Sequence, residues 1–445
     1  MKSLKITAAL APALALMVFT GAVDADENWP QFRGPSQNNV STAVGLPETW
    51  SDTENIVWKT PMPSWSGSSP VIWGDRVFVT SPSTPDDSES GEPVAQSALR
   101  GPGGPEILLL CLSKENGEIL WQRTLATDNY LRRKHNASSP TPVTDGEHVW
   151  TLTGTGVVAA FDMDGNRQWE ADLQEAYGPL GLMFGYGSSP LLHDGKLIIQ
   201  VLHGYRTDDP SYLVAFDALT GEVVWRVERP TDAEHESPDA YTTPTLLEYG
   251  AQTQFVVTGG DYVTGHDPQT GEELWRAAGL NPRKLTNYRI ISSAVAVDGM
   301  IYAPTRRRPL LALRAGGTGD VTSSHLAWQW DAAGGPDVPT PACDGTYFYM
   351  VEDRGMVTCL DAKTGEVIWG PEHTARGTVS ASPLLADGKL YITNEDGVTT
   401  VLAAGPEFKV LAANEVPGVY VLSSFGVSGN QLFLRTATHL YCIGE

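Results

Sequence analysis

The stretch Asp217-Ala-Leu-Thr-Gly-Glu-Val-Val-Trp225 decides the fold, because close variants of it return along the chain. Apolar residues precede the aspartate, the glycine supplies the positive φ of a tight turn, and the next strand ends on tryptophan. This is the pattern of a β-hairpin. Four further copies end at Trp121, Trp169, Trp275 and Trp369, and two degenerate copies span residues 315–330 and 403–410. The chain is therefore built from a repeated hairpin.

A second hairpin signal precedes each copy. It opens on a Ser/Thr-Pro-like pair, continues through an apolar strand and a tight turn, and ends in another strand. The eight openings are Ser69-Pro70, Ser139-Pro140, Ser189-Pro190, Thr243-Pro244, Ser292-Ser293, Thr340-Pro341, Ser382-Pro383 and Ser423-Ser424. Each unit thus holds four strands, A to D, and residues 54–445 divide into eight units of about 49 residues. We predict an all-β protein, an eight-bladed β-propeller of four-stranded antiparallel blades.

The eighth unit stops before its own D strand. The missing strand is present near the other terminus as Asn55–Thr60, which carries Trp58 at the expected place. We expect Asn55–Thr60 to pair with Leu440–Ile443 and close the last blade, which leaves no open sheet edge. Residues 26–53 are then an N-terminal extended segment.

The first 25 residues have the pattern of a signal peptide. Lys2 and Lys5 precede an apolar run over residues 6–20, and Val23-Asp24-Ala25 offers a cleavage site. An uncleaved anchor is the alternative. We expect an exported protein, periplasmic or extracellular, with no membrane span after cleavage.

Composition restricts the partners. The formal charge is −23, with 30 basic against 53 acidic residues. This argues against nucleic acid, which needs a cationic surface. We expect the partner to be an exported protein, whose identity the sequence leaves unknown, or an anionic small molecule. The cysteines Cys111, Cys343, Cys359 and Cys442 are expected to be buried small apolar residues without disulfides.

The phrase Asp-x-x-Thr-Gly-Glu-x-x-Trp resembles the pyrroloquinoline quinone (PQQ) repeat. That repeat builds the propellers of quinoprotein alcohol dehydrogenases and of the outer-membrane barrel-assembly lipoprotein. The opening Asn28–Pro35 is similar to the start of exported planctomycete-type proteins with PQQ-like repeats. The resemblance implies that the repeat tryptophans dock neighbouring blades, and it assigns this role to Trp58, Trp121, Trp169, Trp225, Trp275, Trp330 and Trp369.

Two functions follow from this resemblance. The first is a ligand- or protein-binding scaffold. The alternative is a quinoprotein oxidoreductase of the alcohol or sugar dehydrogenase type, which would use PQQ and a calcium ion on oxygen ligands. The adjacent cysteine pair of many such enzymes is absent here. The sequence nominates no catalytic residue and no metal ligand.

A site is expected on the face that carries the D–A and B–C connections, because these are long and variable whereas the A–B and C–D turns are short. Arginines gather there in an acidic chain, which suits an anionic ligand. The alternative is that they pair with nearby carboxylates and hold the loops together. The candidate residues are Trp65, Arg132, Arg133, His135, Asn136, Tyr186, His203, Arg206, His235, Glu236, Arg289, Arg306 and Arg376.

Overall fold

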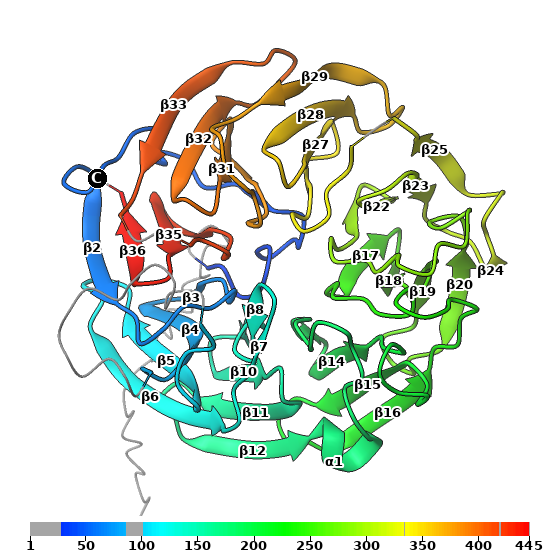
Figure 1. Ribbon diagram of the computed structural model, residues 1–445, viewed down its shortest axis with the longest axis horizontal. Coiled ribbons are helices and arrows are strands. Elements are labelled where there is room, and N and C mark those ends of the chain that lie inside the picture. The colour runs from blue at the N-terminus through cyan, green and yellow to red at the C-terminus, as the bar shows by residue number, and fades with distance from the viewer. Residues whose placement is uncertain (1–27, 86–100, 333, 418–419, 445) are drawn as a thin grey trace, which may run out of the picture.

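A computed structural model describes residues 28–85, 101–332, 334–417 and 420–444. The predicted signal peptide lies outside the described residues. Within these ranges the chain forms eight four-stranded antiparallel blades around a central axis, as predicted (Figure 1). Within the same ranges, no helix is both long and apolar enough to cross a membrane.

The first four blades follow one another along the chain. Blade 1 is β3 (Val71–Trp73), β4 (Arg76–Pro82), β5 (Ile107–Ser113) and β6 (Ile119–Ala126). Blade 2 is β9 (Val143–Thr144), β10 (His148–Leu152), β11 (Val157–Asp162) and β12 (Arg167–Asp172). Blade 3 is β13 (Leu191–His193), β14 (Lys196–Val201), β15 (Tyr212–Asp217) and β16 (Val223–Glu228). Blade 4 is β17 (Thr245–Tyr249), β18 (Gln252–Gly259), β19 (Tyr262–His266) and β20 (Glu273–Ala277), with β24 (Gly319–Asp320) added at its edge.

The remaining blades complete the ring. Blade 5 is β21 (Val295–Val297), β22 (Met300–Ala303), β23 (Leu310–Arg314) and β25 (Leu326–Trp330). Blade 6 is β26 (Ala342–Cys343), β27 (Tyr347–Val351), β28 (Met356–Asp361) and β29 (Val367–His373). Blade 7 is β30 (Leu384–Ala386), β31 (Lys389–Thr393), β32 (Val398–Ala403) and β33 (Val410–Glu415), with β1 (Val40–Ser41) beside β30. Blade 8 is β34 (Gly426–Ser428), β35 (Gln431–Arg435), β36 (His439–Ile443) and β2 (Ile56–Pro61). Outside the blades lie the hairpin β7 (Leu131–Arg132) and β8 (His135–Asn136), and the helix α1 (Leu173–Tyr177).

The predicted closure of blade 8 is confirmed. Strand β2 pairs antiparallel with β36, placing Trp58 opposite Cys442 and Thr60 opposite Leu440. A strand from the N-terminal part of the chain and the last strand of the described residues therefore share one sheet, which closes the ring.

Tryptophans on the D strands fasten most neighbouring blades. The indole N–H of Trp169 donates to the carbonyl of Ala218 in the C–D turn of the next blade, at 2.8 Å. The same contact is made by Trp58 to Lys114, Trp121 to Met163, Trp225 to Pro268 and Trp369 to Gly405. Cys111, Cys359 and Cys442 pair directly with docking tryptophans and are buried free thiols, which confirms the small buried residue expected at that register.

Two of the predicted docking tryptophans behave differently. In blade 5 the docking residue is Trp328, which pairs with Ala312 and donates to Ala362, whereas Trp330 donates to Gly334. Trp275 donates to Gln254 of its own blade at 2.8 Å. The C–D connection of blade 5 is enlarged, and its strand β24 pairs in parallel with β20, so the turn that would receive Trp275 is replaced by an added strand.

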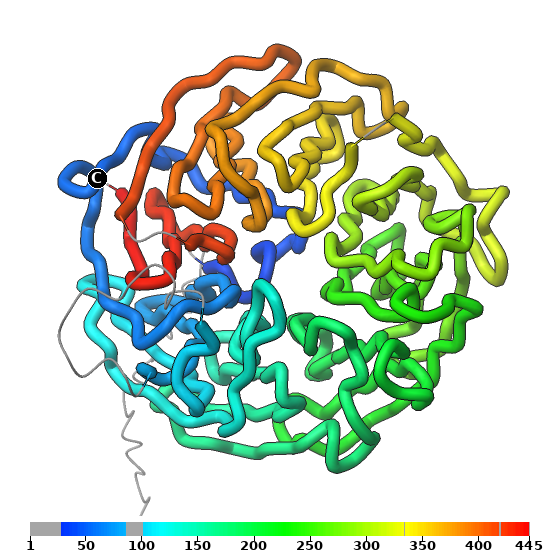
Figure 2. The backbone as a smooth tube through the Cα atoms, in the orientation of Figure 1, coloured from blue at the N-terminus to red at the C-terminus, as the bar shows by residue number. Residues whose placement is uncertain are grey.

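The N-terminal extended segment crosses one end of the central axis, and we call residues 28–50 the floor segment. Trp29 exchanges two backbone hydrogen bonds with Ile72 of blade 1. The buried guanidinium of Arg33 donates to the carbonyls of Gln37 and Ala294, both at 2.8 Å, and to the Thr245 hydroxyl at 2.9 Å. Strand β1 then joins blade 7. Figure 2 shows this dark-blue segment passing through the middle of the ring. Its hydrogen bonds to Ile72 and Leu385 on A strands place it at the face of the A–B turns.

Candidate functional site

A closed ring of hydrogen bonds surrounds the central axis. At the start of each A strand, a backbone N–H donates to the Ser or Thr hydroxyl of the next blade, at 2.9–3.1 Å. We call these eight residues the hydroxyl ring: Ser69, Thr141, Ser189, Thr243, Ser293, Thr340, Ser382 and Ser424. The sequence had marked Ser139-Pro140 as the opening of the second unit, but Thr141 holds the matching register. The repeated Ser/Thr-Pro opening therefore joins the blades at the axis.

A cavity of about 400 Å³ occupies the axis beside the hydroxyl ring. Phe32 of the floor segment lines it, and the β7–β8 hairpin carries cationic residues to its wall. Apolar walls come from Phe184, Tyr241 and Ile291. The other lining residues are Gly67, Arg132, Arg133, Lys134, His135, Ser139, Gly187, Arg289, Asp337, Val338, Asp353, Ser380, Leu422 and all of the hydroxyl ring except Ser69. The structure thus places a small amphiphilic cavity where the D–A connections converge.

The structure brings together only part of the predicted site. Arg132, Arg133, His135 and Arg289 line the cavity, whereas Glu236 and Arg306 lie behind it in ion pairs. The aromatic and polar candidates are buried and hydrogen-bonded to backbone groups; they are Trp65, Asn136, Tyr186 and His203. The exposed candidates Arg206, His235 and Arg376 do not line the cavity.

Ion pairs account for some of the arginines. Arg289 lies 3.5 Å from a carboxylate oxygen of Glu236 and 3.2 Å from Asp337, and Arg306 lies 3.7 Å from Asp337. By contrast, Arg132 and Arg133 form no ion pair with any described residue. Their guanidinium groups lie over Tyr130 at 5.3 Å and Phe184 at 4.9 Å from the ring centroids. Both interpretations of the arginines therefore apply, each to different residues.

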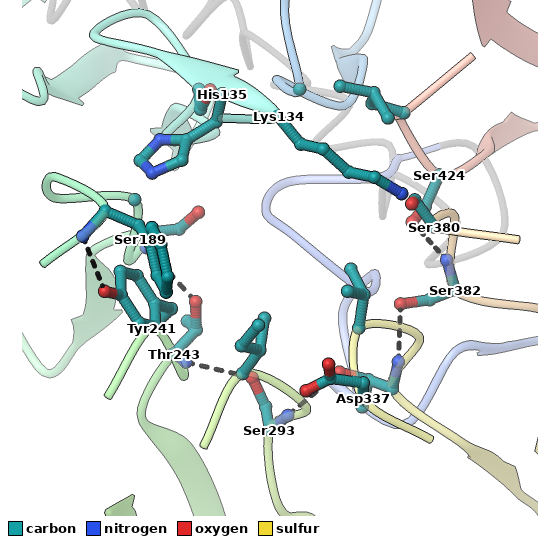
Figure 3. A pocket seen from close by; sticks show the side chains of 18 of the residues that line it. Lys134, His135, Ser189, Tyr241, Thr243, Ser293, Asp337, Ser380, Ser382 and Ser424 are labelled. Carbon is teal, nitrogen blue, oxygen red and sulfur yellow. Dashed lines mark hydrogen bonds between the residues drawn. The ribbon is translucent and has the colours of Figure 1, made fainter. Parts of the chain in front are cut away.

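His135 is the most unusual group of the cavity. Figure 3 shows its imidazole turned into the cavity, with the Asp337 carboxylate on the opposite wall. Both ring nitrogens are buried, and neither has a hydrogen-bond partner among the described residues. Burial lowers the pKa of His135 to about 4, so the imidazole is neutral at pH 7.

Sequence reasoning missed several lining residues. Lys134 stands inside a run of basic residues and bonds Glu395 at 2.7 Å. Asp337 and Asp353 carry no local signal. Burial raises the pKa of Asp353, and its carboxylate accepts the N–H groups of Asp337 and Val338.

The calcium ion and PQQ of the enzyme alternative can be tested against these residues. Calcium takes six to eight oxygen ligands, largely carboxylates. No three His, Cys, Asp or Glu side chains of the described residues group to hold a metal ion. The two carboxylates of the cavity, Asp337 and Asp353, already bond arginine and backbone N–H groups. The donor set does not fit calcium, and we derive no step through PQQ.

Asp239 ties together the loops around the cavity and should make stability depend on pH. Its buried carboxylate accepts the N–H groups of Met183 and Tyr205, and burial raises its pKa to about 6. Since the folded state binds this proton more tightly than the unfolded state, the contribution is present at low pH and lost as pH rises through 6. The free energy of unfolding of wild type minus Asp239→Asn should fall by about 2 kcal/mol between pH 4.5 and 7. Urea unfolding of both proteins at each pH measures this difference. A difference that does not change with pH would contradict the raised pKa of Asp239.

Known proteins resemble this chain over the repeated region. The family model described as outer membrane protein assembly factor BamB matches residues 106–323 and 316–405. The protein of that name from Yersinia pestis is 23% identical over 300 residues, covering 65% of this chain and 68% of that protein. The one from Bordetella pertussis (strain Tohama I) is 23% identical over 276 residues, covering 59% of this chain and 61% of that protein. The resemblance inferred from the repeat is confirmed.

Solved structures show the same fold. BamB from Moraxella catarrhalis superposes with a TM-score of 0.60 at 14% identity, covering 87% of this chain and 99% of that one. A europium-containing methanol dehydrogenase gives a TM-score of 0.68 at 12% identity, covering 94% of this chain and 98% of that one. The quinohemoprotein alcohol dehydrogenase from Comamonas testosteroni gives a TM-score of 0.62 at 11% identity, covering 94% of this chain and 80% of that one. At these identities the likeness concerns the fold alone.

Proposed function

The chain belongs to the family described as outer membrane protein assembly factor BamB, and from this premise we propose that it is an exported protein-binding scaffold. The predicted signal peptide supports export, with the periplasm as the compartment. The relatives carry the name of an assembly factor, which supports a protein as the partner.

One observation carries the proposal and selects the binding face. The floor segment covers the axis on the face of the A–B turns, through hydrogen bonds to blades 1, 2, 4, 5, 6 and 7. The opposite face, which we call the loop face, carries the long D–A and B–C connections. Arg132 and Arg133 lie on it without ion pairs, and Tyr205 is 45% exposed there. A partner therefore docks on the loop face.

The alternative, a PQQ- and calcium-dependent oxidoreductase, draws its support from dehydrogenases of similar fold. The described residues offer no calcium ligand set and no carboxylate free to act as a base in the cavity. The scaffold is the function that the geometry supports better.

Two tyrosines on opposite faces test the binding face. A photocrosslinking amino acid at Tyr205 should yield a discrete adduct in living cells, and the same group at Tyr249, at the end of β17 beside an A–B turn, should not. The two side chains are 45% and 41% exposed, so accessibility is matched. Mass spectrometry identifies the adduct, and binding of the purified partner is then measured by calorimetry.

The two arginines on the loop face provide a second test of the proposal. Arg132→Glu/Arg133→Glu should weaken binding of the identified partner by about 10-fold or more, because opposite charges steer and hold the complex. Arg314→Glu, an exposed change near the other face, should leave it unchanged. Equal crosslinking from Tyr205 and Tyr249, or equal affinity of both variants, would refute the proposal.

A further inference from the structure

The central cavity has the shape of a small-molecule site. Its volume of about 400 Å³ lies within the usual range for pockets that enclose a small ligand. The floor segment closes the end nearest the A–B turns with Phe32, so entry is from the loop face. A folded partner cannot enter such a space, but a small molecule can.

Buried polar atoms inside the cavity are left without partners. Both ring nitrogens of His135 and the hydroxyl of Ser139 have no hydrogen bond within the described part of the chain. Such atoms cost free energy when buried, and most buried polar groups in proteins are paired. The unpaired atoms of His135 and Ser139 point to a ligand that forms hydrogen bonds with them.

The charges are arranged from one side to the other. Arg132, Arg133 and His135 come from the β7–β8 hairpin, and the first two have no ion pair. On the opposite wall, Asp337 presents its carboxylate (Figure 3), which is ion-paired with Arg289, and Asp353 also lines the cavity. A ligand with a single negative charge at one end is attracted, while a second negative charge would meet these carboxylates.

The remainder of the lining combines residues of the hydroxyl ring with apolar side chains. The apolar side chains are Phe32, Phe184, Tyr241, Ile291, Val338 and Leu422. This apolar part favours a hydrocarbon or aromatic body over inorganic phosphate.

We propose that the cavity binds a small organic monocarboxylate, whose carboxylate is held by Arg133 and His135 while its apolar body packs against Phe184 and Ile291. The site shares Arg133 with the loop face but does not require a docked protein. It requires no metal ion.

Calorimetry with the full exported chain tests the ligand class. Benzoate should bind with a Kd of about 0.1–1 mM, as expected for so few atoms. Benzamide, which has the same shape without the charge, should bind about 10-fold more weakly, because charge-assisted hydrogen bonds are lost. Phthalate, with a second carboxylate, and inorganic phosphate should also bind about 10-fold more weakly.

Variants test the residues. Arg133→Gln and His135→Phe should each weaken benzoate binding by about 10-fold, and Arg314→Gln, on the opposite face, should not change it. Arg133 is exposed, so its variant folds even if His135→Phe does not. Benzoate should also shift the imidazole NMR signals of His135 in the wild type, and benzamide should not.

Three results would overturn the proposal. They are equal affinity for benzoate and benzamide, unchanged affinity in Arg133→Gln, and binding of PQQ with Ca²⁺ in preference to benzoate. The last would favour the cofactor site of the enzyme alternative. None of these three results would change the outcome expected from crosslinking at Tyr205 and Tyr249. The ligand proposal can therefore be refuted while the scaffold proposal stands.

Discussion

Gly221→Ala lowers the free energy of unfolding by about 3 kcal/mol, the first of the two largest effects that we expect. Gly221 has a φ of +74°, where a side chain is strained by about 1 kcal/mol. A Cβ atom there would also lie 2.6 Å from the Trp169 ring of the preceding blade. Overpacking of this kind costs a further 1–3 kcal/mol, roughly. The substitution therefore acts on the joint between two blades.

A matched glycine in the same blade separates the two causes. Gly195 has a φ of +69°, but no atom lies within 4 Å of its Cβ position. Gly195→Ala should cost about 1 kcal/mol, from the backbone conformation alone. Urea unfolding followed by tryptophan fluorescence measures both variants. If the two differ by less than about 0.5 kcal/mol, the Trp169 contact does not stabilise the joint.

Arg33→Met lowers the free energy of unfolding by about 4 kcal/mol, the second large effect. The change keeps the aliphatic stem but removes a guanidinium that is 1% exposed. The carbonyl of Gln37 and the Thr245 hydroxyl then lose their donor inside the protein, and the Ala294 carbonyl keeps only the Thr245 hydroxyl. Each buried group left unpaired costs about 1–3 kcal/mol. The floor segment should detach from blades 4 and 5.

The control is Arg314→Met, an exposed change that should cost less than about 0.5 kcal/mol. Hydrogen exchange gives the local readout: the Leu246 N–H, which donates to Gln37, should lose protection in Arg33→Met. Unchanged exchange at Leu246, or a stability equal to that of Arg314→Met, would show that Arg33 does not hold the segment.

The fold could be predicted because its information is local. Each repeat encodes a hairpin within a few residues, and Trp58 bears the mark of the missing D strand. The prediction of Trp330 was wrong because Trp328 and Trp330 lie two residues apart on the same side of β25, so the local pattern fits both. Trp275 matches the repeat fully, yet its partner depends on β24, which lies 44 residues further along the chain in register with it.

The cavity was harder to predict than the blades. Its residues come from the floor segment and from D–A connections of several blades, and no spacing links Phe32, Ile291 and Asp337. Loop position suggested Trp65, Tyr186 and His203, but these connections pack on one another and bury such side chains. Basic residues in an acidic chain were the useful signal, since they led to Arg132, Arg133, His135 and Arg289.

The floor segment also restricts the order in which parts of the molecule can fold. Residues 28–61 are synthesised early, but several of their contacts need partners that are synthesised much later. Arg33 needs Ala294, β1 needs β30, and β2 needs β36. Contacts between residues so distant in sequence form late, because the intervening chain must first be closed into a loop. Although residues 33–61 are synthesised before the blades, these contacts can form only after blades 5, 7 and 8 have been made, whereas Trp29 can pair with Ile72 earlier.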